Sequence, residues 1–408
     1  MTILRFFILF FSLVFLAFLV RPDDVSVEGR LKTYSKQIED NPDKPEGYYE
    51  LGKIYIQQKK YQAALKLLNT ATRLKKDYGE AYREKGIAGF YLNQFLDAEK
   101  TILKSFNLDP AQPNIATDLG SIYLKNGNIK KAFRYLQVAQ NRNNNLHIVL
   151  NNLGAAYAET GENKEALKLW KQALEINPNI PETYVNLGVI YEQMGQKKKA
   201  LTAYQKALEL DESNAMAHFN LAVIYAKDNN FQKAVEEWEA SLKLTEQVEA
   251  NDKNILNSLA WAYEKLGKRK KALVMLNKSI KLSPYDPITH FSSGRIRDDL
   301  GDGSGAIKSF KKAIQLDPNF GDAYYRMGLA FDAQNQSYNA ISSLLIAEII
   351  YHKTMKMDLF EKVQAKLKSL FEKHQTQRAD FKGLELPETL KGYDLNQRPN
   401  QIRTSKEK

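Results

Sequence analysis

The sequence lacks cysteine altogether and contains only five histidines among its 408 residues. Without thiols the chain can form no disulfide, thiolate zinc site, cysteine nucleophile or lipid-modified cysteine. The few histidines argue against an imidazole-rich metal site, and none belongs to a His-Glu-x-x-His pair. Residues 301–305 are rich in glycine but lack the Gly-Lys-Ser/Thr ending of a phosphate loop. The sequence therefore predicts a protein that is not an enzyme and has no cofactor or metal.

Long apolar runs are also missing, except for one at the start. Residues 6–20 carry no charge, and the 18 residues from Ile3 to Val20 are interrupted only by Arg5. As a helix they would extend roughly 27 Å, close to the thickness of a hydrocarbon core. We expect residues 1–21 to form an uncleaved signal-anchor or single-pass transmembrane helix. A cleaved signal peptide is the alternative, but bulky residues follow Ala17 where a cleavage site needs small ones.

The side of the membrane on which the rest of the chain lies stays open. The positive charges that flank residues 6–20 favour the C-terminal part inside, yet a very short positive N-terminal flank is also typical of an export signal. If the segment is cleaved, the protein would be secreted or periplasmic.

A repeat dominates the remaining sequence. A small residue recurs every 34 residues, with one interval of 38, at Gly52, Gly86, Gly120, Gly154, Gly188, Ala222, Ala260, Gly294 and Gly328. Twelve residues after each of them stands an alanine: Ala64, Ala98, Ala132, Ala166, Ala200, Ala234, Ala272, Ala306 and Ala340. A period of this length indicates stacked supersecondary units that bury their apolar faces against one another.

These columns resemble the tetratricopeptide repeat. The resemblance implies an all-α, right-handed superhelical solenoid of helix-turn-helix units, preceded here by one N-terminal hydrophobic helix. We expect a linker and N-capping helix over 22–44 and nine repeats over 45–352. A C-terminal capping helix over 353–374, which carries Val363 and Leu367 on its apolar stripe, and a polar, largely disordered tail over 375–408 would follow.

The resemblance also implies a binding site, because such arrays hold extended peptides or partner helices in a concave groove lined by the first helices. Asn152, Asn186 and Asn220 stand two residues before the small residue in three consecutive repeats. They resemble the asparagine ladder of the O-GlcNAc transferase superhelix. An amide both donates and accepts, so it can pair with any peptide unit. Selectivity would come from Tyr184, Val185 and Phe219, whereas the alternative is that the asparagines simply face water.

Two further features of the groove follow from the same columns. Glu50, Glu84 and Asp118 occupy the asparagine column in the first three repeats and make the early groove acidic. A carboxylate clamp of the cochaperone kind needs lysine, asparagine and arginine together. Ala155 and Val189 at the neighbouring groove positions argue against it.

The net charge of +11 raises a different possibility. Basic runs recur at 59–60, 130–131, 197–199 and 268–271, near the turns into the second helices. They would meet anionic lipid or nucleic acid, or would be ordinary solvated turns. The sequence thus favours a membrane-anchored scaffold or adaptor that binds a protein or peptide. The alternatives are a non-catalytic subunit of an enzyme or envelope-assembly complex and a basic-edge binder of lipid or nucleic acid.

Overall fold

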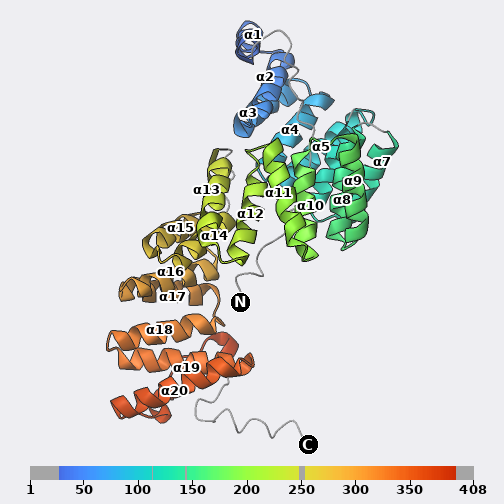
Figure 1. Ribbon diagram of the computed structural model, residues 1–408. Helices are drawn as coiled ribbons and strands as arrows, with labels where there is room; N and C mark the ends of the chain where they lie inside the picture. Colours follow the sequence, from blue (N-terminus) through green and yellow to red (C-terminus); the bar gives the residue numbers. More distant parts are fainter. Residues whose placement is uncertain (1–26, 113, 143–144, 248–252, 392–408) are drawn as a thin grey trace, which may run out of the picture. The chain divides into compact units, whose positions relative to one another are not determined.

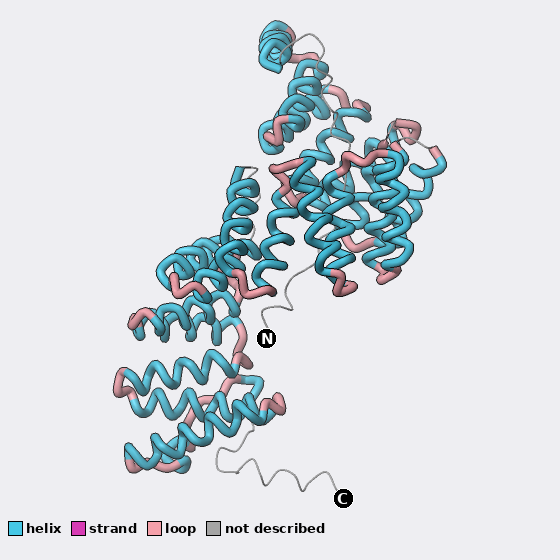
Figure 2. Tube along the Cα trace, in the orientation of Figure 1, coloured by secondary structure: helices cyan, strands magenta, loops and turns pink. Residues whose placement is uncertain are grey.

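The computed structural model describes residues 27–112, 114–142, 145–247 and 253–391, and for residues 246 and 247 only the backbone. This part of the chain contains twenty α-helices, two short 3-10 helices and no strand. Figures 1 and 2 show the helices joined one after another by short loops. The predicted all-α repeat fold is confirmed. The chain divides into two compact units, residues 1–251 and 252–408, and each is described by itself below.

The described helices follow one another with short turns. In the first unit they are α1 Val27–Asp40, α2 Pro45–Gln57, α3 Tyr61–Leu74, α4 Gly79–Tyr91, α5 Phe95–Leu108, α6 Ile115–Lys125, α7 Ile129–Asn141, α8 Leu146–Glu159, α9 Asn163–Ile176, α10 Pro181–Gln193, α11 Lys197–Leu210, α12 Ala215–Lys227 and α13 Phe231–Gln247. In the second unit they are α14 Lys253–Lys265, α15 Arg269–Leu282, α16 Pro287–Asp299, α17 Gly303–Leu316, α18 Gly321–Ala333, α19 Ser337–Lys353 and α20 Met357–His374, followed by η2 Arg378–Phe381 and η3 Glu388–Leu390.

Each repeat is a pair of helices that approach closely where the first one carries its small residue. A Cβ placed on Gly188 of α10 would lie 2.3 Å from Cε1 of Tyr204 on α11, and one on Gly154 of α8 would lie 2.5 Å from Nε1 of Trp170 on α9. The nine periodic alanines lie on the second helices and are all buried. The small residues therefore admit a large side chain from the paired helix of the same repeat.

The turn inside each repeat needs one residue in the left-handed region. It stands seven positions after the small residue, with φ between 58° and 84°, at Lys59, Asn93, Gly127, Gly161, Gly195, Asn229, Gly267, Gly301 and Asn335. Glycine and asparagine tolerate this conformation, whereas a lysine is strained there. The glycine-rich segment at 301–305 is thus part of a helix-connecting turn.

The C-terminal end of the second unit closes its own core. Helix α20 buries Phe360, Val363, Leu367 and Leu370, as the predicted apolar stripe requires. The following residues also pack on the repeats. Phe381 stacks on Tyr338 with ring centroids 5.1 Å apart, and the Thr389 hydroxyl donates to Asn319 Oδ1 at 2.8 Å.

The prediction of a largely disordered tail was therefore wrong for residues 375–391. Phe381 and Leu390 are almost fully buried, and their ordering supplies a cover for α19, which has nine consecutive buried residues, 343–351. Glu348 on that helix is buried and pairs with Arg378 at 2.6 Å. Residues 392–408 lie outside the described part of the chain.

The predicted N-terminal membrane helix, residues 1–21, also lies outside the described residues. Among the helices from α1 to α20, none combines the length and the apolar character that crossing a bilayer requires.

Candidate peptide-binding groove

The predicted asparagine column lies on three first helices of the first unit. Asn152 on α8 and Asn186 on α10 are fully buried, and Asn220 on α12 is 8% exposed. Two residues correspond to about 200° of an α-helix, so each asparagine lies nearly opposite the small residue that faces the second helix. The column therefore lies on the side of each first helix that is turned away from its partner helix.

A buried amide network joins consecutive first helices, and its centre is a residue that the sequence did not single out. Asn151 Oδ1 accepts hydrogen bonds from Thr183 Oγ1 at 2.9 Å and from Asn186 Nδ2 at 3.1 Å. Asn152 Oδ1 accepts from Asn151 Nδ2 at 3.2 Å, and Asn152 Nδ2 donates to Ser121 Oγ at 2.7 Å. The amides thus link α6, α8 and α10, and their peptide-binding role stays a prediction.

Asn220 differs from the other two asparagines. Its Nδ2 group is buried and has no hydrogen-bond partner among the described residues. Asn151 stands 35 residues before Asn186, and the residue 35 positions before Asn220 is Val185, which is fully buried and offers no acceptor in its side chain. The series of polar contacts between consecutive first helices, here called the polar ladder, therefore ends at α12, where the Asn220 amide donor has no acceptor among the described residues. The other two predicted selectivity residues, Tyr184 and Phe219, are half-buried.

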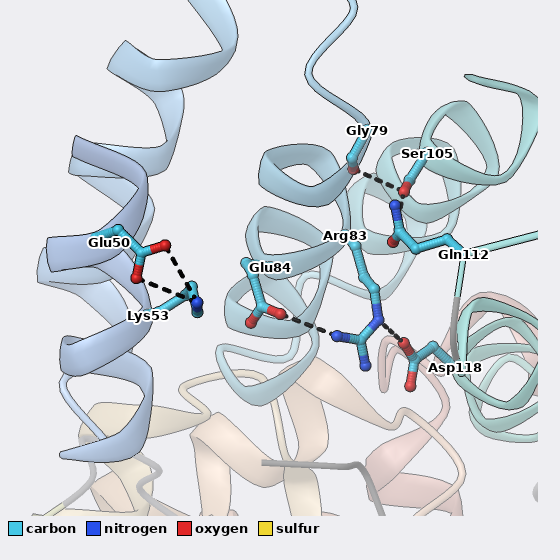
Figure 3. A network of polar contacts seen from close by, with 8 residues as sticks. All are labelled: Glu50, Lys53, Gly79, Arg83, Glu84, Ser105, Gln112 and Asp118. Atoms are coloured by element: carbon cyan, nitrogen blue, oxygen red, sulfur yellow. Dashed lines mark hydrogen bonds and ion pairs between the residues drawn. The ribbon is translucent and has the colours of Figure 1, made fainter. Parts of the chain in front are cut away.

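The acidic start of the column is a mixed charge cluster (Figure 3). Arg83 Nε lies 2.5 Å from Asp118 Oδ2, and Arg83 Nη1 lies 2.9 Å from Glu84 Oε1. On α2, Lys53 pairs with Glu50 at 3.1 Å. The prediction from the sequence identified the three carboxylates but not the two cations that accompany them.

Burial determines the electrostatics of this cluster. Arg83, Glu84 and Asp118 are at most 7% exposed. Desolvation raises the pKa of the Glu84 and Asp118 carboxyls, and the neighbouring Arg83 guanidinium opposes this shift. Within the described part of the chain, Asp118 Oδ1 and Arg83 Nη2 are buried without a hydrogen-bond partner. The cluster therefore holds both an unused acceptor and an unused donor.

The basic runs near the turns are engaged in part by aromatic rings. One lysine of each pair or run lies over a tyrosine of the same repeat, with Nζ–centroid distances of 4.8 Å for Lys131 and Tyr123, 5.5 Å for Lys199 and Tyr191, and 5.4 Å for Lys271 and Tyr263. Such contacts stabilise by about 0.5–1 kcal/mol at exposed sites. Part of the basic character thus serves packing within the repeats.

Within the described residues, no group of three or more His, Asp and Glu side chains is arranged to hold a metal ion. The polar groups gathered on the first helices are amides, two hydroxyls and an ion-pair cluster. Such groups form hydrogen bonds to a peptide backbone.

Comparison with known proteins places the chain in a family. The family model described as the Cilia and flagella-associated protein 70 C-terminal domain matches residues 111–326, more than half of the chain. A tetratricopeptide repeat model matches residues 45–78. The chain belongs to the Cilia and flagella-associated protein 70 C-terminal domain family and is a tetratricopeptide repeat protein, a type that generally forms non-catalytic scaffolds for protein interactions. Among curated proteins, none matches the sequence.

Three solved structures are similar to the chain, and the first of them shows the same fold. The Cut9–Hcn1 hetero-tetramer of the APC/C is 13% identical with a TM-score of 0.52, and the match covers 83% of each chain. YrrB, described as a TPR protein with an unusual peptide-binding site, is 25% identical with a TM-score of 0.41 over 44% of this chain and 91% of its own. The pilF protein of Pseudomonas aeruginosa is 18% identical with a TM-score of 0.46 over 54% of this chain and 97% of its own.

Proposed function

We propose that this protein is a membrane-anchored scaffold that holds an extended segment of a partner protein along the first helices of its N-terminal unit. The apolar residues 1–21 would anchor it in the membrane, on a side that the sequence leaves open. The partner's backbone would pair with the amides of the asparagine column, so that binding would depend little on the partner's side chains.

The observation that carries this proposal is the open donor of Asn220. A buried amide hydrogen without an acceptor costs about 1–3 kcal/mol, and a partner's carbonyl oxygen would remove that cost. Asn152 and Asn186 are fully buried and bonded within the network, so Asn220 is the residue of the column whose amide gains most from a partner.

The experimental test begins by identifying the partner protein. Crosslinking in native membranes followed by mass spectrometry would identify the captured protein, and its binding would then be measured with purified full-length chain. Asn220→Ala should weaken that binding about tenfold, the effect of one lost buried hydrogen bond of about 1.4 kcal/mol. Asn69→Ala, a change at an exposed position on α3, should leave binding unchanged.

A second variant tests the same donor without removing it. Val185→Thr keeps the shape of the side chain and supplies an acceptor where the ladder stops, so it should also weaken partner binding. Full affinity in both Asn220→Ala and Val185→Thr would refute the groove as the binding site.

A further inference from the structure

The net positive charge of the second unit is concentrated on two helices. Residues 253–391 contain 23 lysines and arginines and 15 aspartates and glutamates, whereas residues 27–247 contain 30 and 27. The helices α15 and α17 carry eight of the basic residues of the second unit and no acidic residue. The rest of residues 253–391 is therefore balanced, with 15 residues of each sign, and the whole excess charge of this part belongs to α15 and α17.

The basic side chains of these helices point away from the core. Ala272 on α15 and Ala306 on α17 are buried against the repeats. Val274 and Lys308 follow two residues later, about 200° around each helix, and both are exposed. The two helices belong to consecutive repeats and both pack on α16, so their outward sides form one surface. This surface, here called the basic face, carries Lys270, Lys278, Lys281, Lys308, Lys311 and Lys312.

Few acidic side chains neutralise the basic face. Lys270, Lys281 and Lys308 form no ion pair with any residue that the structure describes. Lys312 Nζ donates to the neutral amide oxygen of Gln315 at 3.0 Å, and Lys311 Nζ lies 5.7 Å from the centroid of an aromatic ring. The equivalent helix of the fourth repeat, α9, mixes three basic with two acidic residues. The basic face therefore keeps its charge for an anionic partner.

Exposed apolar side chains accompany the lysines. Val274, one turn from a lysine on either side, is 51% exposed, and Leu282 and Tyr285 at the end of α15 are 43% and 79% exposed. The rings beneath Lys271 and Lys311, which are Tyr263 and Phe331, are buried and offer no platform on which bases could stack. Cations around aliphatic side chains and a tyrosine suit the interface of a bilayer, which takes up both kinds of group.

We propose that the basic face lies on an anionic phospholipid bilayer and gives the protein a membrane contact in addition to the proposed anchor. Headgroup phosphates would accept hydrogen bonds from the lysine ammonium groups, while Val274 and Tyr285 would enter the interface. Each lysine near such a surface shifts the binding equilibrium about fivefold. The contact would hold the second unit against an anionic bilayer but not against a neutral one, and it does not depend on the groove of the first unit.

The absence of cysteine from the sequence permits a test with a single fluorescent probe. Full-length Asn277→Cys, with an NBD fluorophore on this exposed position of the basic face, is bound to vesicles. Its emission should rise and shift to the blue with vesicles of phosphatidylcholine and phosphatidylglycerol, but not with phosphatidylcholine alone. The control probe, Gln172→Cys at an exposed position of α9, should respond to neither.

The dependence on charge is tested with two matched variants. Lys308→Gln, Lys311→Gln should weaken the contact reported by the Asn277 probe about 25-fold, because each charge contributes about fivefold. The contact is followed as the phosphatidylglycerol fraction of the vesicles is raised. Lys168 and Lys171 are exposed and occupy the same two places in the fourth repeat, so Lys168→Gln, Lys171→Gln should leave the contact unchanged. Equal weakening in both variants would overturn the proposal.

Flotation of the vesicles separates this contact from the anchor. A silent Asn277 probe on protein that floats with the anionic vesicles would overturn the inference and leave the proposed anchor standing. Protein that does not bind these vesicles would overturn it as well. Single-stranded RNA and polyglutamate, added without vesicles, test the other polyanions. A larger response of the probe to either of them than to the anionic vesicles would assign the basic face to nucleic acid or to an acidic protein instead.

Discussion

Replacing Gly188 by alanine tests the close contact between the two helices of a repeat. The new Cβ would lie 2.3, 2.6 and 2.8 Å from three ring carbons of Tyr204. That ring is fully buried, so it cannot swing aside without disturbing the surrounding core. Overpacking of this kind costs about 1–3 kcal/mol, and the better helix propensity of alanine returns about 1 kcal/mol. We therefore expect a net loss of up to about 2 kcal/mol.

Gly89 on α4 provides a matched control, because it is also a buried glycine inside a first helix. A Cβ there would meet Ala98 at 3.7 Å, an ordinary contact. Gly89→Ala should therefore stabilise the protein by about 0.5–1 kcal/mol. The two alanine variants should move the urea midpoint, followed by circular dichroism, in opposite directions. Because parts of a repeat array can unfold separately, hydrogen exchange of α10 and α11 should locate the loss.

A rescue variant tests whether Tyr204 causes the loss. Adding Tyr204→Leu to Gly188→Ala reproduces the pair found in the seventh repeat, where Ala260 stands at the small-residue position and Leu276 is the large side chain. The double variant should unfold at a higher urea concentration than Gly188→Ala alone. A midpoint for Gly188→Ala at or above that of the wild type would show that the repeat does not pack as described.

Three further outcomes follow from single contacts. Lys59→Gly should raise stability by about 1 kcal/mol in urea unfolding, because φ is +59° there; no gain would contradict a strained turn. Trp170 Nε1 donates to a backbone carbonyl at 2.9 Å, whereas Trp238 Nε1 is buried without a partner, so Trp170→Phe should cost about 1–2 kcal/mol more than Trp238→Phe; equal losses would argue against it. The hydrogen bond to Glu237 raises the pKa of His218. Its stabilisation is therefore full below the ordinary histidine pKa and lost as pH rises through the raised value, and urea midpoints of wild type and His218→Gln should converge above it.

The fold could be predicted because the two helices of every repeat pack against each other in the same way. A small residue and an alanine at fixed spacing reappear wherever two helices must approach, so their period reveals the architecture. The tail at 375–391 could not be predicted in this way, because its apolar residues that pack on the core, Phe381, Leu384, Leu386 and Leu390, stand at irregular intervals among polar neighbours. Isolated apolar residues give no periodic signal.

The polar contacts of the groove were predicted only in part. In two of these contacts the residues lie in neighbouring repeats and are 35 residues apart, one more than the 34-residue period. Arg83 and Asp118 are separated by 35 residues, as are Asn151 and Asn186. A column-by-column reading of a 34-residue period compares each residue with its equivalent and therefore misses contacts between unlike columns. The ion pair of Arg83 and the central role of Asn151 both fall into this class.

The same offset determines which asparagines hold neighbouring repeats together and which one is available to bind a partner. Buried polar groups stabilise a structure when each has its partner and destabilise it when one is missing. Between α4 and α10 the ladder has its bonds from helix to helix, so removing Asn152 or Asn186 disturbs stacking as well as any bound peptide. At α12 the residue at the offset position is Val185, and the Asn220 donor has no acceptor among the residues that the structure describes. Effects on partner binding that are free of effects on folding are therefore to be sought at Asn220, where the ladder ends.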